Sequence, residues 1–182
     1  MESGPSDPWR LSEALAGNSH AWNGIVEEFS QSVWNWARGQ GLSREDAEDV
    51  SQTVWYRLKD NGRAIRDPRT LPGWLATTTR REAIRVGKRR NHAARSELDE
   101  NVADATVSTS DPAQMVEVAD LNRRLAAGFT ELRPLCRELL SLCWNEELSY
   151  REIAEILDRP IGSIGPTRQR CLDDLRVLAG IS

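Results

Sequence analysis

Long polar side chains gather near the C-terminal end of the sequence, where they could read DNA. The segment Gly-Pro-Thr-Arg-Gln-Arg occupies residues 165–170, directly after a tight turn predicted at 158–162. When a helix enters the major groove, its first turns meet base edges, where arginine pairs with guanine and glutamine with adenine. The predicted DNA-contacting residues of this helix are Ser163, Thr167, Arg168, Gln169 and Arg170. The alternative is an ordinary antiparallel pair of helices in a bundle.

Two predicted helices must hold these side chains in place. Ser149 and Glu152 have the spacing of a capping box, which predicts the start of a short helix with an apolar face over 153–157. After the turn, Ser163 is expected to cap a last helix that runs to about residue 178. Two helices joined by a tight turn are typical of a helix-turn-helix.

A second candidate site is a basic helix predicted over 71–91. It begins near Trp74 and then becomes strongly basic, and positions 81, 85, 88 and 89 share one face. Basic side chains hold phosphates, and an aromatic side chain can stack on an unpaired base. The competing interpretation makes Trp74 a core residue and the basic run a solvated face. The residues of this predicted site are Trp74, Thr78, Arg80, Arg81, Arg85, Lys88 and Arg89.

A third candidate is the polar face of a helix predicted to start at Ser43. Asp46, Asp49, Gln52 and Trp55 follow one another at intervals of three, while the apolar residues between 47 and 58 point to the core. Taken alone, this pattern is most simply a solvated helix face.

Enzyme chemistry finds little support in the sequence. The two histidines, His20 and His92, are far apart, and no phosphate-binding loop or nucleophile elbow is present. We therefore predict no catalytic residue, no metal site and no cofactor. With three cysteines a disulfide framework is not expected, and Cys136 and Cys143 have the spacing of core residues. We expect reduced thiols in a cytoplasmic protein.

The charge distribution divides the chain. The 182 residues carry a net charge of -4, yet residues 63–95 hold ten Lys or Arg against two acids, and residues 96–118 hold six acids and no base. Apolar periodicity is helical almost throughout and is lost over 93–110. We predict an all-α fold with one unit at 1–92, a flexible acidic linker at 93–111 and a helix-turn-helix unit at 112–182. No segment has the length and hydropathy of a membrane span or a secretory signal.

Three motifs, in this order, resemble a bacterial RNA polymerase sigma factor of the extracytoplasmic-function group, within the sigma-70 family. They are Asp-Ala-Glu-Asp-Val-Ser-Gln-Thr-Val-Trp at 46–55, Leu-Pro-Gly-Trp-Leu-Ala-Thr-Thr-Thr-Arg-Arg at 71–81, and the segments 148–157 and 161–170. The resemblance covers roughly 20–92 and 115–178.

The resemblance implies a role for each candidate site. The helix with Asp46, Asp49, Gln52 and Trp55 would bind the clamp coiled coil of core RNA polymerase. The helix from Trp74 to Arg89 would grip and melt the minus-ten element of promoter DNA. The last helix would read the minus-thirty-five element. Family members commonly have an anti-sigma factor as a further partner, although no residue of this chain identifies one.

Two other interpretations remain open on the residues themselves. A stand-alone helix-turn-helix regulator that does not engage polymerase would bind duplex DNA tightly as a free protein. A helical adaptor whose basic block binds an acidic protein would have no effect on DNA.

Overall fold

The computed structural model describes residues 8–93, 112–144 and 148–181. Every regular element within these ranges is a helix, which confirms the predicted all-α class. The predicted acidic linker at 93–111 lies outside the described residues except for Ala93, the last residue of α4.

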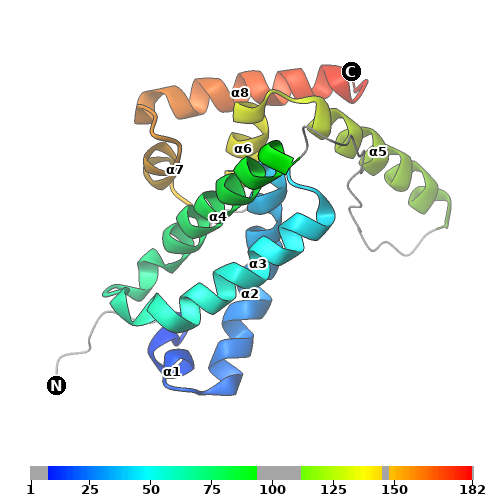
Figure 1. The fold of residues 1–182 in the computed structure, drawn as a ribbon. Helices are drawn as coiled ribbons and strands as arrows, with labels where there is room; N and C mark the ends of the chain where they lie inside the picture. Colours follow the sequence, from blue (N-terminus) through cyan, green and yellow to red (C-terminus); the bar gives the residue numbers. More distant parts are fainter. Residues whose placement is uncertain (1–7, 94–111, 145–147, 182) are drawn as a thin grey trace.

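The first group of helices comprises α1, α2, α3 and α4, with two short 3-10 turns before α4. In Figure 1, α2, α3 and α4 pack against one another and α1 lies at the end of α2. Their shared core contains the fully buried side chains of Phe29, Val33 and Leu75. The element bounds are α1 Leu11–Leu15, α2 Ser19–Gly39, α3 Arg44–Asn61, η1 Gly62–Ala64, η2 Pro68–Thr70 and α4 Leu71–Ala93.

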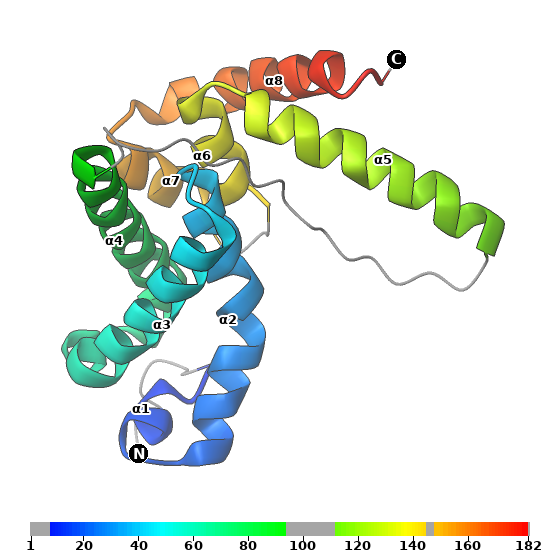
Figure 2. The same ribbon diagram turned by 45° about the vertical axis from the view of Figure 1, so that its right-hand side comes forward.

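The second group is built around α8, which packs against α5, α6 and α7. Figure 2 shows α5 projecting outward while α6 and α7 lie between α8 and the first group. The buried residues Leu139, Ile153 and Ile164 form the centre of this group. The element bounds are α5 Pro112–Glu131, α6 Pro134–Leu142, α7 Tyr150–Leu157 and α8 Ile161–Leu178.

Most predicted helix starts are confirmed by their hydrogen bonds. Ser43 caps α3 by accepting from the backbone N–H of Asp46 at 3.2 Å. Ser149 and Glu152 complete a capping box, in which the backbone N–H of Ser149 donates to the Glu152 carboxylate at 2.8 Å. These side chains satisfy backbone donors that a helix N-terminus leaves unpaired, so the local sequence alone sets the start.

The predicted start of the last helix is three residues too late. α8 begins at Ile161 with Pro160 at its N-cap, and the Ser163 hydroxyl donates to the backbone carbonyl of Pro160 at 2.7 Å. Asp158, with φ of +53°, ends α7 in the left-handed conformation and turns the chain toward α8. Ser163 therefore lies inside the first turn and does not cap the helix.

The two groups of helices touch. α6 packs against α2 and α7 packs against α4, and the buried apolar side chains of both groups form a continuous cluster. This places α6 between the first group and α8.

Candidate nucleic-acid and polymerase interfaces

The basic helix α4 presents a narrow stripe of predicted DNA-contacting residues. Trp74, Thr78, Arg81, Arg85 and Lys88 are separated by four, three, four and three positions, so they lie on one side of the helix. Arg81, Arg85 and Lys88 are exposed, whereas Trp74 and Thr78 are half-buried. The opposite side of α4 is buried, and Ala76 and Ala83 on it are 0% and 1% exposed. We call these five residues the α4 stripe.

The α4 stripe is held in position by an ion-pair network below it. Glu82 is buried, and its carboxylate contacts Arg57 of α3 at 2.9 Å and Arg85 at 3.2 Å. A buried carboxylate is stable only when it is paired, so Glu82 links the α4 stripe to α3. Because the Arg85 side chain is still 53% exposed, its guanidinium remains available to a phosphate.

Two predicted contact residues of α4 lie off the stripe. Arg80 turns toward the second group of helices, where its guanidinium is paired with Glu138 of α6. Arg89 is exposed beside Lys88 and extends the basic end of the helix. The structure therefore brings five of the seven predicted residues onto one line and engages Arg80 elsewhere.

The polar face of α3 is exposed, although not all of its predicted residues contribute. Asp49 and Gln52 are exposed, and they lie in line with Glu45 and Tyr56 at helical spacing. Asp46 is half-buried and accepts from the Ser43 hydroxyl at 2.8 Å.

Trp55 was predicted to contact a partner, but its neighbour Tyr56 is the more exposed aromatic residue of α3. The Trp55 ring packs edge to face against Trp22 of α2, with ring centroids 6.5 Å apart, and is half-buried. Tyr56 is 69% exposed, which makes it the large aromatic residue that the polar face actually presents. Its place in line with Glu45, Asp49 and Gln52 is the signal that could have added it to the predicted contact set.

Of the predicted DNA-contacting residues of α8, Gln169 and Arg170 in its third turn are the exposed ones. Both residues are exposed, and the Gln169 amide donates to Asp173 at 3.1 Å. The Arg170 guanidinium reaches back along its own helix, where it contacts the Pro166 carbonyl at 3.3 Å and the Thr167 hydroxyl at 3.4 Å. These contacts are weak and exposed, so DNA can replace them.

Arg168 is half-buried and lies against Cys143, the residue that follows α6. Burial raises the pKa of the Cys143 thiol, and the nearby positive charge of Arg168 opposes part of that rise. The Arg168 side chain thus links α8 to Cys143 at the end of α6, while its neighbour Gln169 is exposed.

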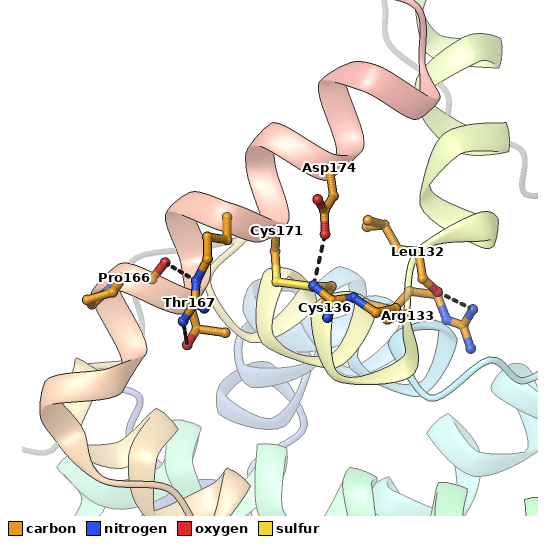
Figure 3. The surroundings of a disulfide bond; sticks show 9 residues. Leu132, Arg133, Cys136, Pro166, Thr167, Cys171 and Asp174 are labelled. Atoms are coloured by element: carbon orange, nitrogen blue, oxygen red, sulfur yellow. Dashed lines mark hydrogen bonds and ion pairs between the residues drawn. A yellow bond between two sulfur atoms is a disulfide. The ribbon is translucent and has the colours of Figure 1, made fainter.

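The expectation of reduced thiols is wrong for two of the three cysteines. Cys136 of α6 and Cys171 of α8 form a disulfide with Cα atoms 5.2 Å apart, and both residues are buried. Figure 3 shows the bond between the two helices, with Arg133 beside it donating to Asp174 at 3.0 Å. Cys143 is the remaining free thiol.

Within the described ranges, no group of three or more His, Cys, Asp or Glu side chains could hold a metal ion. In the same part of the chain, no helix is both long and apolar enough to cross a bilayer.

Comparison with known proteins finds a family match for part of the chain. Residues 25–93 match the Sigma-70 region 2 family, and this range contains α3 and α4. The chain is similar to the ECF RNA polymerase sigma factor SigE of Mycolicibacterium smegmatis, with 27% identity over 158 residues, which is 86% of this chain. It spans 60% of the length of that relative. The ECF sigma factor RpoE of Cereibacter sphaeroides is 29% identical over 136 residues, with 74% of this chain and 70% of RpoE covered.

Solved structures have the same fold. The sigma factor RpoE of Bartonella quintana, solved in complex with the anti-sigma factor NepR, superposes with a TM-score of 0.68 at 20% identity and covers 88% of this chain and 98% of RpoE. CnrH, solved with the cytosolic domain of CnrY, has a TM-score of 0.57 at 21% identity and covers 94% of this chain and 96% of CnrH. The region 2 match and these relatives make the chain similar to bacterial RNA polymerase sigma factors of the extracytoplasmic-function group, and the solved structures share its fold.

Proposed function

We propose that the chain binds core RNA polymerase and directs it to specific promoters, where it opens the duplex. The observation that carries this proposal is the α4 stripe, which lies inside the residues matched to Sigma-70 region 2 and combines an aromatic residue with exposed cations. Cations hold the phosphates of the separated strand, and a base that leaves the stack toward Trp74 offsets part of the cost of unstacking.

The other two faces supply the remaining contacts of the proposal. The α3 face, with Asp49, Gln52 and Tyr56 exposed, would dock on the clamp coiled coil of the polymerase. The N-terminal half of α8 would enter the major groove upstream, with Gln169 and Arg170 nearest the bases. In this proposal α3 binds the polymerase, α4 holds the separated strand, and α8 recognises the upstream promoter element.

Reconstitution tests the proposal directly. The purified chain is mixed with bacterial core RNA polymerase and a promoter library, and transcription start sites are read by sequencing. We expect starts at a defined subset of promoters that core polymerase alone does not use.

The matched control is a chain that carries Arg81→Ala and Lys88→Ala on the α4 stripe. It should keep polymerase binding through α3 and lose the start sites. A wild-type chain that binds duplex DNA tightly but never associates with core polymerase would refute the proposal and favour a stand-alone regulator.

A further inference from the structure

The Gln169 side chain of α8 is held by a carboxylate one turn further along the same helix. Its amide nitrogen, Nε2, donates to Oδ1 of Asp173 at 3.1 Å. The same oxygen of Asp173 accepts from Nη1 of Arg176 at 3.3 Å. Because a carboxylate only accepts hydrogen bonds, the nitrogen end of the Gln169 amide must face it. The contact therefore fixes which way round the amide lies.

Gln169 and Asp173 lie on the side of α8 that faces away from α6. Cys171, midway between them, is buried and joined by a disulfide to Cys136 of α6 (Figure 3). A step of two residues is a rotation of about 200° around a helix, so the residues on either side of Cys171 point outward. Gln169 is exposed, and 56% of the Asp173 side chain is exposed. The pair is thus open to solvent above an anchored stretch of backbone.

The charged neighbours of Asp173 on the N-terminal side and the C-terminal side have other contacts. The Arg170 guanidinium turns back to the Pro166 carbonyl at 3.3 Å. Asp174 accepts from Arg133, which precedes α6, at 3.0 Å. Two adjacent aspartates therefore have different roles, since Asp174 joins two helices and Asp173 acts within α8.

The part of the Gln169 amide that stays free matches one base better than the others. The amide has two N–H donors and one carbonyl oxygen, and one N–H is given to Asp173. One donor and one acceptor therefore remain. In the major groove adenine presents an acceptor, N7, beside a donor, N6, whereas guanine presents two acceptors, N7 and O6. Gln169 held in this way can pair with both groups of adenine but with only one of guanine.

We infer that Asp173 is a positioning residue that determines specificity, because it makes Gln169 a reader of an A·T pair in the upstream promoter element. A glutamine without this partner rotates its terminal amide easily and meets other bases as well, so it discriminates less. Asp173 itself does not touch the bases, and its negative charge opposes binding to the phosphates of every sequence. Asp173 therefore lowers the affinity for DNA in general and raises the selectivity at one base pair. The inference rests on the proposed function, because promoter binding is what brings duplex DNA to α8.

The test measures base preference in the holoenzyme assembled from the full chain and core RNA polymerase. Promoters with a randomised upstream element are bound, and the bound and unbound pools are sequenced. The wild type should prefer an A·T pair at one upstream position, and Gln169→Ala should abolish that preference. Asp173→Ala should reduce the same preference by about twofold to tenfold, which is the cost of ordering one flexible side chain. Promoters with another base pair at that position should bind the Asp173→Ala holoenzyme more tightly than the wild type, whereas simple loss of structure would weaken binding to all promoters.

Two further variants separate position from charge. Asp174→Ala is the matched control, since it removes the same charge one residue away from a carboxylate that is paired with Arg133. It should leave the base preference unchanged. Asp173→Glu keeps a carboxylate one turn from Gln169 and should retain the preference for an A·T pair. Thermal melts of each variant verify that the second group of helices stays folded.

Nuclear magnetic resonance of the free chain tests the contact without polymerase or DNA. The side-chain N–H of Gln169 that is donated to Asp173 should resonate downfield in the wild type. The signal should move upfield in Asp173→Ala and stay in place in Asp174→Ala, because only the first change removes the acceptor.

Three results would overturn the inference. One is a base preference that Asp173→Ala leaves unchanged, and another is a preference that survives Gln169→Ala at every upstream position. The third is a wild-type preference for a G·C pair at the position that Gln169→Ala relaxes. A wild-type holoenzyme that selects no base pair at any upstream position would instead refute the proposed function, so the two failures are distinguishable.

Discussion

Arg90, near the basic end of α4, is paired with the carboxylate of Asp46 in the first turn of α3. The Asp46 side chain is 23% exposed and also accepts from the Ser43 hydroxyl at the helix start. Asp46 therefore joins α3 to α4, whereas Asp49, one turn further on, is exposed. Two carboxylates that look alike in the sequence have different surroundings.

This difference predicts separate effects for the two aspartates. Asp49→Ala, and likewise Gln52→Ala, should weaken binding to core polymerase by about fivefold to tenfold and leave the melting temperature unchanged. Asp46→Asn should lower the free energy of unfolding by about 0.5–1 kcal/mol, since a partly exposed pair is lost. Surface plasmon resonance measures the binding of each variant to core polymerase, and thermal melts measure its stability. If both aspartates behave alike, α3 does not present the proposed face.

The exposure of Gln169 predicts a change of specificity. Gln169→Ala in the holoenzyme should relax the preference at one upstream promoter position by about 1–3 kcal/mol while sparing opening on a pre-melted template. Arg168→Ala should also lower the stability of the second group of helices, because Arg168 packs against Cys143. Arg151→Ala is a suitable control, as this side chain is 82% exposed on α7. Equal loss of activity on every upstream sequence would make α8 a scaffold and not a reader.

The basic end of α4 should affect all promoter sequences equally, in contrast to Gln169. Lys88→Ala with Arg89→Ala should slow promoter opening on all sequences alike, and each lost phosphate contact should lower the salt slope by about one. Arg123→Ala with Arg151→Ala, on α5 and α7, serves as a charge-matched control because both side chains are exposed and distant in sequence from α4. Opening rates measured across a salt series check the prediction, which a sequence-dependent defect would contradict.

The disulfide between α6 and α8 should stabilise the second group of helices. Cys136 and Cys171 are 35 residues apart, and closing a loop of that length restricts the unfolded chain enough to be worth up to about 4 kcal/mol. Reduction with a dithiol, or Cys136→Ala with Cys171→Ala, should lower the melting temperature by several degrees. Cys143→Ser should keep the difference between reduced and oxidised melts, because Cys143 is outside the bond. Alkylation and mass spectrometry verify the redox state in each sample.

The lowered pKa of Asp67, which precedes α4, predicts that the melting temperature depends on pH. Its carboxylate accepts hydrogen bonds from the side chain and backbone N–H of Arg69, and these lower the pKa of Asp67. A carboxyl whose pKa is depressed by folding adds stability above its unfolded pKa of about 4, and that stability is lost as the pH falls through the lower folded value. The melting temperature of the wild type should therefore exceed that of Asp67→Asn near about pH 6, and the gap should shrink progressively as the pH falls below about 4. A gap that widens in acid would contradict the assignment.

Much of the fold was predictable because its determinants are local. Ser43, Ser149 and Glu152 set helix starts through backbone contacts three residues away, and such contacts can be recognised from sequence spacing alone. The start of the last helix was predicted wrongly because its N-cap, Pro160, has no side chain that can cap a helix. Ser163 is the nearby residue of a type that usually caps, so the sequence favoured it. Apolar periodicity predicts that a segment is helical, whereas the first residue of the helix depends on the backbone conformation at its end.

The candidate sites were only partly predictable because their selection depends on contacts between distant segments. Nothing near Arg80 in the sequence indicates that Glu138 will engage it, 58 residues away. Likewise, Cys136 and Cys171 become partners only because α6 and α8 pack together. A side chain's face on its own helix can be read from spacing, but its availability depends on what the rest of the fold places there.

The α4 stripe sets the size of the strand segment that this helix can hold. Trp74 and Lys88 are fourteen residues apart, which corresponds to ~21 Å along a helix at 1.5 Å per residue. Successive nucleotides in a stacked strand are ~3.4 Å apart, so the helix covers about six of them. A transcription bubble that extends further must be held open by polymerase or by another part of this chain. The footprint that α4 alone protects from a single-strand-specific chemical probe should then stop after about six nucleotides.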